Sequence, residues 1–211
     1  MPTLLQRLAE QPGRYRPIVV DNASNDGTAQ VAKDFGAVVV HESRPGYGAA
    51  VHTGVCAARP GLVAVLDGDG SLDPADLLAL VDLVAGGHAE LAVGRRRPVG
   101  RGVWPAHARL GSNLVAAGLR HRGVPVHDIA ALRVADRDGL LALGVQDRRS
   151  GYPLELLLRA AAAGWRISER DVSYRPRAAG THSKVSGSLR GSLIAATDFA
   201  SVLRTDWAFS R

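Results

Sequence analysis

The feature that most constrains this chain is an apolar run at residues 62–66, which ends in the acidic turn Asp67-Gly68-Asp69. A short apolar run bounded by turn residues predicts a buried strand. Asp67 and Asp69 then stand at its carboxyl end, where open α/β sheets bind their ligands. Two carboxylates at this spacing can hold Mg²⁺ or Mn²⁺ and leave coordination positions for substrate phosphates. The alternative is that Asp-Gly-Asp-Gly is turn chemistry that binds nothing.

A third acidic residue, Asp73, follows this turn and precedes a helix. It stands directly before Pro74, with Asp76 three residues later. An acidic N-cap followed by proline at the first helical position is typical of a helix start. We therefore expect Asp73 to be structural rather than a metal ligand.

Strands and helices alternate along the first half of the chain. The expected strands there are residues 16–20, 37–40, 62–66 and 90–93, and the expected helices are 3–11, 28–35, 46–58 and 74–85. This alternation predicts βαβ units and a largely parallel sheet.

After residue 94 the pattern is looser, and the run 95–105 is a basic segment rich in turn formers. Strands are expected at 129–134 and 166–174, helices at 106–119, 136–143, 152–163 and 189–203, and a loop at 176–188. Because no linker, repeat or low-complexity run interrupts the chain, we expect one domain over 1–211. Its two halves meet near residue 94.

Arginine dominates the charge of the chain. There are 26 basic and 20 acidic residues, a net charge of +6, and only Lys33 and Lys184 are lysines. Arginine favours bidentate contacts with phosphate, and a positive surface suits nucleotides or phospholipid headgroups. Because the arginines are dispersed, with no zinc-finger spacing and no aromatic RNA-binding motif, nucleic acid is not an expected partner.

Cellular location is constrained by cysteine content and hydropathy. With Cys56 as the only cysteine, no intrachain disulfide can form, which permits a reduced setting. No signal peptide is visible, and no stretch reaches the roughly 18 apolar residues that a membrane span needs. We therefore expect a cytoplasmic protein whose membrane contact is peripheral, on the inner face.

Five motifs occur in an order that resembles a known family. They are residues 19–28 (Val-Val-Asp-Asn-Ala-Ser-Asn-Asp-Gly-Thr), 44–50 (Arg-Pro-Gly-Tyr-Gly-Ala-Ala), 67–69 (Asp-Gly-Asp), 93–96 (Val-Gly-Arg-Arg) and 181–186 (Thr-His-Ser-Lys-Val-Ser). Together they resemble the family 2 glycosyltransferases of the GT-A fold, and within these the polyprenyl-phosphate (dolichol-phosphate) sugar synthases. The resemblance spans about residues 16–204. It implies an α/β GT-A (Rossmann-like) three-layer sandwich with a mostly parallel mixed sheet.

In the first half, the resemblance implies a site for a nucleoside diphosphate sugar. Asp67 and Asp69 would hold Mg²⁺ or Mn²⁺ against the diphosphate, with Asp69 also serving in catalysis; such a cation offsets the charge of the departing nucleotide. The other expected nucleotide-binding residues are Asp21, Asn22, Arg44, Gly46, Gly48 and Gly68. Many relatives have lysine between the two glycines where this chain has Tyr47. Two alternatives stay open for Arg44, which either substitutes for that lysine or is simply an exposed arginine.

In the second half, the resemblance implies a site for a lipid phosphate acceptor. Its expected phosphate-binding residues are Arg96, Arg109, Ser112, Arg177, Ser183 and Lys184, because arginine forks suit phosphate. Asp128 and Glu155 are the remaining expected catalytic residues. Two alternatives stay open here. The Gly-Phe-Arg element that follows the aspartate in relatives is Ala131-Leu132-Arg133, which leaves the role of Asp128 open, and Glu155 could instead be a solvent-facing carboxylate.

The implied activity is inverting transfer of a hexose from a donor of the GDP-mannose or UDP-glucose type to a polyprenyl phosphate. Trp104, Trp207 and Phe209, each close to an arginine, are candidates for contact with a membrane surface. Relatives begin with one further strand, and this chain starts after it. We therefore expect a sheet without that central strand, an unpaired edge, and weakened nucleotide binding or a homodimer.

Two other functions remain open at this point. Residues 65–72 are similar to the nucleophile motif of haloacid dehalogenase-type phosphatases, with Asp67 attacking phosphate and Asp69 acting as the acid. That similarity covers few residues, and no late acidic pair follows it. The other alternative is a non-catalytic scaffold that keeps the fold without the activity.

Overall fold

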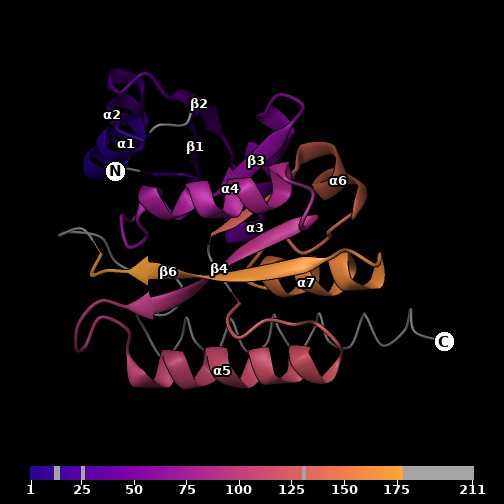
Figure 1. Ribbon diagram of the computed structural model, residues 1–211. Helices are drawn as coiled ribbons and strands as arrows, with labels where there is room; N and C mark the ends of the chain where they lie inside the picture. The colour runs from indigo at the N-terminus through magenta and orange to yellow at the C-terminus, as the bar shows by residue number, and fades with distance from the viewer. Residues whose placement is uncertain (12–14, 25–26, 130–131, 178–211) are drawn as a thin grey trace.

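The computed structural model describes residues 1–11, 15–24, 27–129 and 132–177 (Figure 1). The strands are β1 (Ile18–Asp21), β2 (Val38–His41), β3 (Leu62–Val65), β4 (Leu91–Pro98), β5 (Arg133–Asp136) and β6 (Ile167–Tyr174). The helices are α1 (Pro2–Ala9), α2 (Thr28–Asp34), α3 (Tyr47–Ala57), the 3-10 turn η1 (Pro74–Asp76), α4 (Leu77–Ala85), α5 (Ala106–His121), α6 (Arg137–Ala142) and α7 (Tyr152–Ala162). The helix expected at 189–203 and most of the preceding loop lie outside the described residues. No described helix is long and apolar enough to cross a membrane.

The strands form two separate ladders. β1 and β2 pair in parallel, with Ile18 opposite Val38. The larger ladder has the order β3-β5-β4-β6, in which β4 and β6 are parallel and β5 is antiparallel to both of its neighbours. The expected parallel character is confirmed for the β1–β2 and β4–β6 pairs. The direction of β5 had no signal in the sequence, because a short apolar run predicts a strand but not the direction of its partner.

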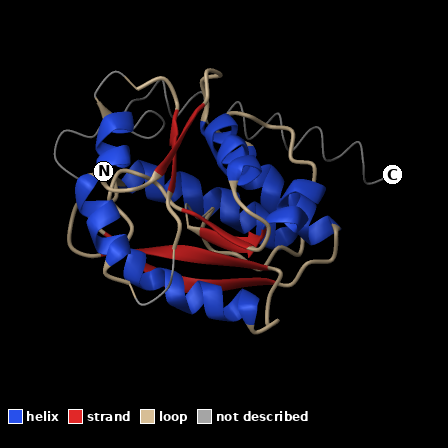
Figure 2. Cartoon of the chain, turned by 90° about the horizontal axis from the view of Figure 1, so that it is seen from above, coloured by secondary structure: helices blue, strands red, loops and turns tan. Residues whose placement is uncertain are grey.

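Helices cover both faces of the four-stranded sheet (Figures 1 and 2). Successive side chains of a strand point to opposite faces, and β4 follows this rule. Leu91 and Val93 join the core cluster that contains Leu157 of α7, whereas Ala92 joins the cluster that contains Leu80 of α4. The fold is therefore the expected α/β arrangement of three layers.

The apolar run that ends at the acidic turn is less buried than its sequence predicts. Leu62 is 43% exposed, and β3 stands at the end of its ladder with β5 as its one described strand partner. The prediction of a buried strand is wrong for β3 because one of its edges carries no neighbouring strand. Asp67 still follows the carboxyl end of this strand, as expected.

The basic segment after residue 94 also differs from its prediction as a loop. β4 continues to Pro98, and Arg95, Arg96 and Arg97 pair in register with Asp171, Val172 and Ser173 of β6. These arginines therefore lie within a strand rather than beyond its end. Sheet pairing with β6, which is distant in the sequence, overrides the turn-forming composition of this segment.

The break between the two ladders matches the expected unpaired edge. Among the described residues, the edge of β1 away from β2 and the edge of β3 away from β5 have no strand partner. Figure 2 shows the two-stranded ladder set apart from the larger sheet. Helix α3 connects the two parts, because it contacts β1 and also packs against α6 and α7.

Candidate active site

The acidic turn after β3 is held in shape by its own backbone. Asp69 Oδ1 accepts a hydrogen bond of 2.9 Å from the Ser71 amide. Asp73 Oδ1 accepts from the Ala75 amide and caps the 3-10 turn, which confirms its structural role. The Asp69 carboxylate is thereby held close to the end of β3.

Three arginines from other elements lie close enough to Asp67 to affect its charge. Burial and the neighbouring Asp69 carboxylate raise the pKa of Asp67 to about 6, against the opposing effects of Arg133, Arg96 and Arg177. These arginines come from β5, β4 and the segment after β6. The positive charge of these three arginines therefore favours the ionised form of Asp67, which is half-buried.

This turn fits a divalent cation that is shared with a substrate. Among the described residues, no group of three or more His, Cys, Asp and Glu side chains comes together. Mg²⁺ is commonly bound by one or two carboxylates together with waters and substrate phosphates, and Asp67 and Asp69 could supply those carboxylates. Burial and the neighbouring Asp69 carboxylate both disfavour the charged form of Asp67, and a bound cation would favour it.

Arg133 is a site residue that the sequence analysis missed as a functional group. It is 2% exposed, and its Nη1 donates a hydrogen bond of 3.2 Å to the hydroxyl of Tyr47. Its Nη2 donates to the carbonyl oxygen of Ile129. An arginine inside an otherwise apolar strand was the available signal, because buried arginines are rare unless they are paired.

Tyr47, which stands between the two glycines, reaches the same centre from the first turn of α3. Burial raises the pKa of Tyr47, and both Arg133 and Asp67 are near enough to contribute. Its hydroxyl is therefore neutral near pH 7 and positions Arg133 rather than carrying a charge itself. The positive charge beside Asp67 comes from Arg133, Arg96 and Arg177 rather than from this position of α3.

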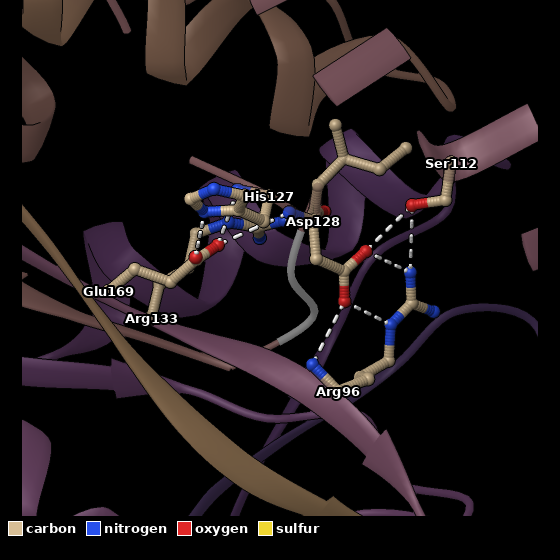
Figure 3. Close-up of polar contacts among 7 residues, drawn as sticks. Arg96, Ser112, His127, Asp128, Arg133 and Glu169 are labelled. Carbon is tan, nitrogen blue, oxygen red and sulfur yellow. Dashed lines mark hydrogen bonds and ion pairs between the residues drawn. The ribbon is translucent and has the colours of Figure 1, made fainter. Parts of the chain in front are cut away.

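Arg96, Ser112 and Asp128 form a second cluster, which Figure 3 shows in detail. Arg96 donates from Nε to Asp128 Oδ2 at 2.7 Å and from Nη2 to Asp128 Oδ1 at 2.6 Å. The Ser112 hydroxyl donates to Asp128 Oδ1 at 2.7 Å. Burial acts to raise the pKa of Asp128, but the hydrogen bonds from Arg96 outweigh it, and the pKa lies below its ordinary value. Asp128 is thus an ionised, fully engaged partner of Arg96.

Aromatic rings fix the other side of Arg96. Its guanidinium carbon lies 4.1 Å from the centre of the Trp104 ring and 5.5 Å from that of Tyr174. Such contacts favour a cation over the ring face. The predicted phosphate ligand Arg96 is therefore oriented before any ligand binds, whereas Arg109 is exposed on α5. The structure thus brings together two of the predicted phosphate-binding residues, Arg96 and Ser112, with the predicted catalytic residue Asp128, whereas Arg109 is not in this cluster.

Glu155 is buried, so the solvent-facing alternative is wrong. Its carboxylate oxygens accept from the amides of Gln146 and Asp147 at 2.9 and 2.6 Å, and Arg159 Nε donates to it at 2.6 Å. Glu155 thereby fixes the loop at 146–149. Its predicted catalytic role stays a prediction, since both oxygens serve this loop.

The same loop contacts the start of α3. The amides of Gly48 and Ala49 donate to the carbonyl oxygens of Arg149 and Arg148. A Cβ added at Gly46 would lie 2.2 Å from the Arg148 carbonyl oxygen, and one at Gly48 would lie 2.7 Å from that of Asp147. The close approach that requires these glycines is to this loop, and their contact with a nucleotide stays a prediction.

Asp21 and Asn22 follow β1 and organise the segment that leads into α3. Asp21 Oδ1 accepts from the Ser24 amide at 3.0 Å. The Asn22 amide group donates to the carbonyl oxygen of Arg44 at 2.8 Å, and its oxygen accepts from the Gly46 amide. The Arg44 side chain itself is exposed. Asn22 thus links the end of β1 to the segment that carries Arg44 and Gly46. The predicted residues Ser183 and Lys184 lie outside the described residues.

The comparisons with known proteins identify the family and agree with this fold. The family model described as "Glycosyl transferase family 2" matches residues 1–130. The chain belongs to this family and is a glycosyltransferase. Membership argues against the phosphatase interpretation of Asp67 and Asp69.

Individual relatives cover most of the chain. An uncharacterized glycosyltransferase of Mycobacterium tuberculosis is 60% identical over 197 residues, which are 93% of this chain and 89% of that protein. A dolichyl-phosphate hexose transferase of Haloferax volcanii is 33% identical over 80% of this chain and 74% of its own length. An undecaprenyl-phosphate mannosyltransferase of Micrococcus luteus is 31% identical over 92% and 85%, respectively.

Solved structures identify the fold. Glucosyl-3-phosphoglycerate synthase from M. tuberculosis, crystallised with Mn²⁺, UDP and glucosyl-3-phosphoglycerate, superposes with a TM-score of 0.72 at 22% identity. The match covers 97% of this chain and 74% of that one. The fold is thus of the GT-A type.

Proposed function

We propose that this protein is a metal-dependent, inverting glycosyltransferase that moves a hexose from a nucleoside diphosphate sugar to a polyprenyl phosphate. The observation that carries the proposal is the Asp67-Gly68-Asp69 turn at the end of β3, with Arg96, Arg133 and Arg177 close to it. Carboxylates for a cation, next to cations for phosphates, suit a reaction in which a diphosphate departs. Relatives named as polyprenyl-phosphate sugar transferases support the acceptor class.

On the donor side, Asp67 and Asp69 hold Mg²⁺ or Mn²⁺. When bound, such a cation neutralises charge that develops on the departing diphosphate. The guanidinium groups of Arg177 and Arg133 pair with oxygens of the same diphosphate. The turn formed by Asp21 and Asn22 lies at the end of β1 and provides the surface for the base and ribose.

On the acceptor side, Arg96 binds the lipid phosphate in the orientation that Asp128, Ser112 and Trp104 impose. The acceptor phosphate is ionised near neutral pH, so its oxygen can attack the anomeric carbon without a strong general base. In one displacement the new carbon–oxygen bond forms while the bond to the diphosphate breaks, which inverts the anomeric centre. The protein contributes positioning and charge stabilisation.

A lipid acceptor requires access to a membrane surface. Arg101 precedes Trp104 by three positions on the segment before α5, and both belong to the acceptor-side half of the chain. Aromatic and basic side chains together favour the interface of an anionic membrane. The location that fits this acceptor is the cytoplasmic face of the membrane, with peripheral attachment.

The test is sugar transfer by the purified protein from labelled GDP-mannose and UDP-glucose to a short polyprenyl phosphate, with and without Mn²⁺. Asp67→Asn should reduce transfer at least about a hundredfold, because removal of one preorganised charge-stabilising group commonly costs that much. Asp73→Asn is the matched control, since asparagine also caps a helix.

Each other outcome of this test supports a different function or a different mechanism. Metal-dependent release of phosphate without sugar transfer would support the phosphatase alternative. If neither reaction occurs with any donor, the scaffold alternative stands. If a product retains the anomeric configuration of the donor, the single displacement is refuted.

A further inference from the structure

The segment that follows β6 lies directly across the acidic turn. Leu72 and Tyr174 form an antiparallel bridge, and the Arg175 amide donates to the carbonyl oxygen of Ser71 at 2.8 Å. The Arg175 side chain pairs with Asp73 at 3.1 Å. The next arginine, Arg177, is therefore brought to the turn by a backbone that is already anchored there.

Arg177 occupies one of the two oxygens of Asp69. Its Nε lies 2.6 Å from Asp69 Oδ2, and the two side chains are only 29% and 21% exposed. The other oxygen of Asp69, Oδ1, accepts the Ser71 amide. Both oxygens are thus engaged, one by the backbone and the other by a side chain that can move.

A divalent cation that uses Asp69 needs one of these oxygens. Displacing the Ser71 amide would distort the turn, whereas displacing Arg177 requires only a change of side-chain rotamers. Two adjacent carboxylates also need positive charge near them, and Arg177 already contributes to the stabilisation of ionised Asp67. Arg177 and a cation therefore supply the same charge to the same oxygen and compete for it.

We propose that Arg177 takes the place of the divalent cation at Asp69 in the ligand-free enzyme and exchanges with it when the donor binds. This inference rests on the proposed function. Once displaced, the guanidinium stays tethered beside the turn and pairs with the donor's diphosphate oxygens, for which its fork geometry is suited. Binding of the cation alone breaks the Arg177–Asp69 ion pair and leaves Arg177 without a new partner. When cation and nucleotide bind together, the diphosphate becomes the new partner of Arg177.

The exchange makes metal and nucleotide binding cooperative. In the wild-type protein, Mn²⁺ alone binds weakly, and UDP or GDP strengthens its binding because Arg177 then has a new partner. Coupling of this kind is reciprocal, so Mn²⁺ strengthens nucleotide binding by the same factor. A protein without Arg177 loses both the competition and the coupling.

The test measures Mn²⁺ binding to the whole chain, by the electron paramagnetic resonance signal of free Mn²⁺ or by calorimetry, without any turnover. Arg177→Gln should tighten the binding of Mn²⁺ alone by about tenfold, the size expected when one charge-assisted contact no longer has to be broken. The same variant should lose most of the gain in Mn²⁺ affinity that UDP or GDP gives the wild type. Arg177→Lys, which keeps the charge, should lie between the two.

Arg175→Gln is the matched control, because it removes an equivalent arginine whose partner, Asp73, caps a helix. It should leave Mn²⁺ affinity within about twofold of wild type, the range of an exposed pair. Equal Mn²⁺ affinity in wild type and Arg177→Gln, or equal tightening by Arg175→Gln, would overturn the exchange while leaving the metal site intact. If neither wild type nor Arg177→Gln binds Mn²⁺ with or without nucleotide, the metal-dependent function fails together with the exchange.

Discussion

Arg133 on β5 donates a hydrogen bond to the hydroxyl of Tyr47 at the start of α3, with 3.2 Å between the two atoms. The contact joins residues 86 positions apart and places a buried guanidinium beside Asp67. Tyr47→Phe keeps the ring and removes the acceptor. We expect the free energy of unfolding to fall by about 1 kcal/mol, which is the net contribution of a typical hydrogen bond. Urea unfolding measures the loss, and an unchanged midpoint would show that the hydroxyl does not position Arg133.

Asp128 and Arg96 form the best-engaged ion pair of the site, with side chains that are 3% and 17% exposed. Asp128→Asn removes one charge and leaves Arg96 partly buried beside two rings. We expect about 3 kcal/mol of destabilisation, because breaking a buried pair leaves an uncompensated charge. Ser112→Ala, which removes only the hydroxyl that donates to Asp128, should cost about 1 kcal/mol. Chemical denaturation of the two variants compares them, and equal losses would contradict this account of the cluster.

Gly48 and Gly118 are both helical, but a side chain would meet very different surroundings at the two positions. A Cβ at Gly48 would lie 2.7 Å from the Asp147 carbonyl oxygen and 2.8 Å from the Tyr152 Cβ, while nothing lies within 4 Å of one at Gly118. We expect Gly48→Ala to destabilise the protein by about 2 kcal/mol through overpacking. Gly118→Ala should stabilise it by about 0.5 kcal/mol through helix propensity. Thermal unfolding measures both variants, and a change in melting temperature of the same sign in the two would contradict this difference in packing.

Glu90 and Arg166 connect the start of β4 to the start of β6 through several hydrogen bonds between their side chains. The hydrogen bonds from the Arg166 side chain and amide lower the pKa of Glu90 to about 2, from an ordinary value of 4.5. A carboxyl whose pKa is lower in the folded state stabilises the fold above the unfolded pKa, and this stabilisation is lost as pH falls toward the folded pKa. As the pH falls from about 5 to about 2, the melting temperature of Glu90→Gln should therefore decrease less than that of the wild type. Parallel losses in scans over this range would remove Glu90 as a contributor to acid stability.

The sequence was a good guide to elements and to the acidic turn, and a poorer guide to what surrounds them. The strand before Asp67, the cap at Asp73 and the helix after it depend on local chemistry, so local patterns predict them. The direction of β5 and the pairing of Arg95 with Asp171 depend on strands far apart in the sequence. Such pairings leave no mark in the spacing of residues within either segment.

The site shows the same division. Asp67 and Asp69 could be identified because their chemistry follows from residue type and spacing. Arg133 could not be assigned a role, because its importance comes from Tyr47 and Asp67, which reach it from other elements. Glu155 was predicted to be near the chemistry, but the structure uses both of its oxygens to hold the 146–149 loop. Gly46 and Gly48 were predicted to bind the nucleotide, which stays a prediction, and the structure shows that the 146–149 loop approaches both glycines closely.

The break between β1 and β3 has a consequence for motion. Because no described strand bridges the two ladders, the β1–β2 pair is coupled to the larger sheet by side-chain packing and helix contacts rather than by a continuous row of amide bonds. Amide protons of β1 and β2 should exchange with solvent sooner than those of β4, whose ladder has neighbours on both sides. The β1–β2 ladder, which leads into Asp21 and Asn22, can then open locally while the four-stranded sheet that carries Arg96 stays intact.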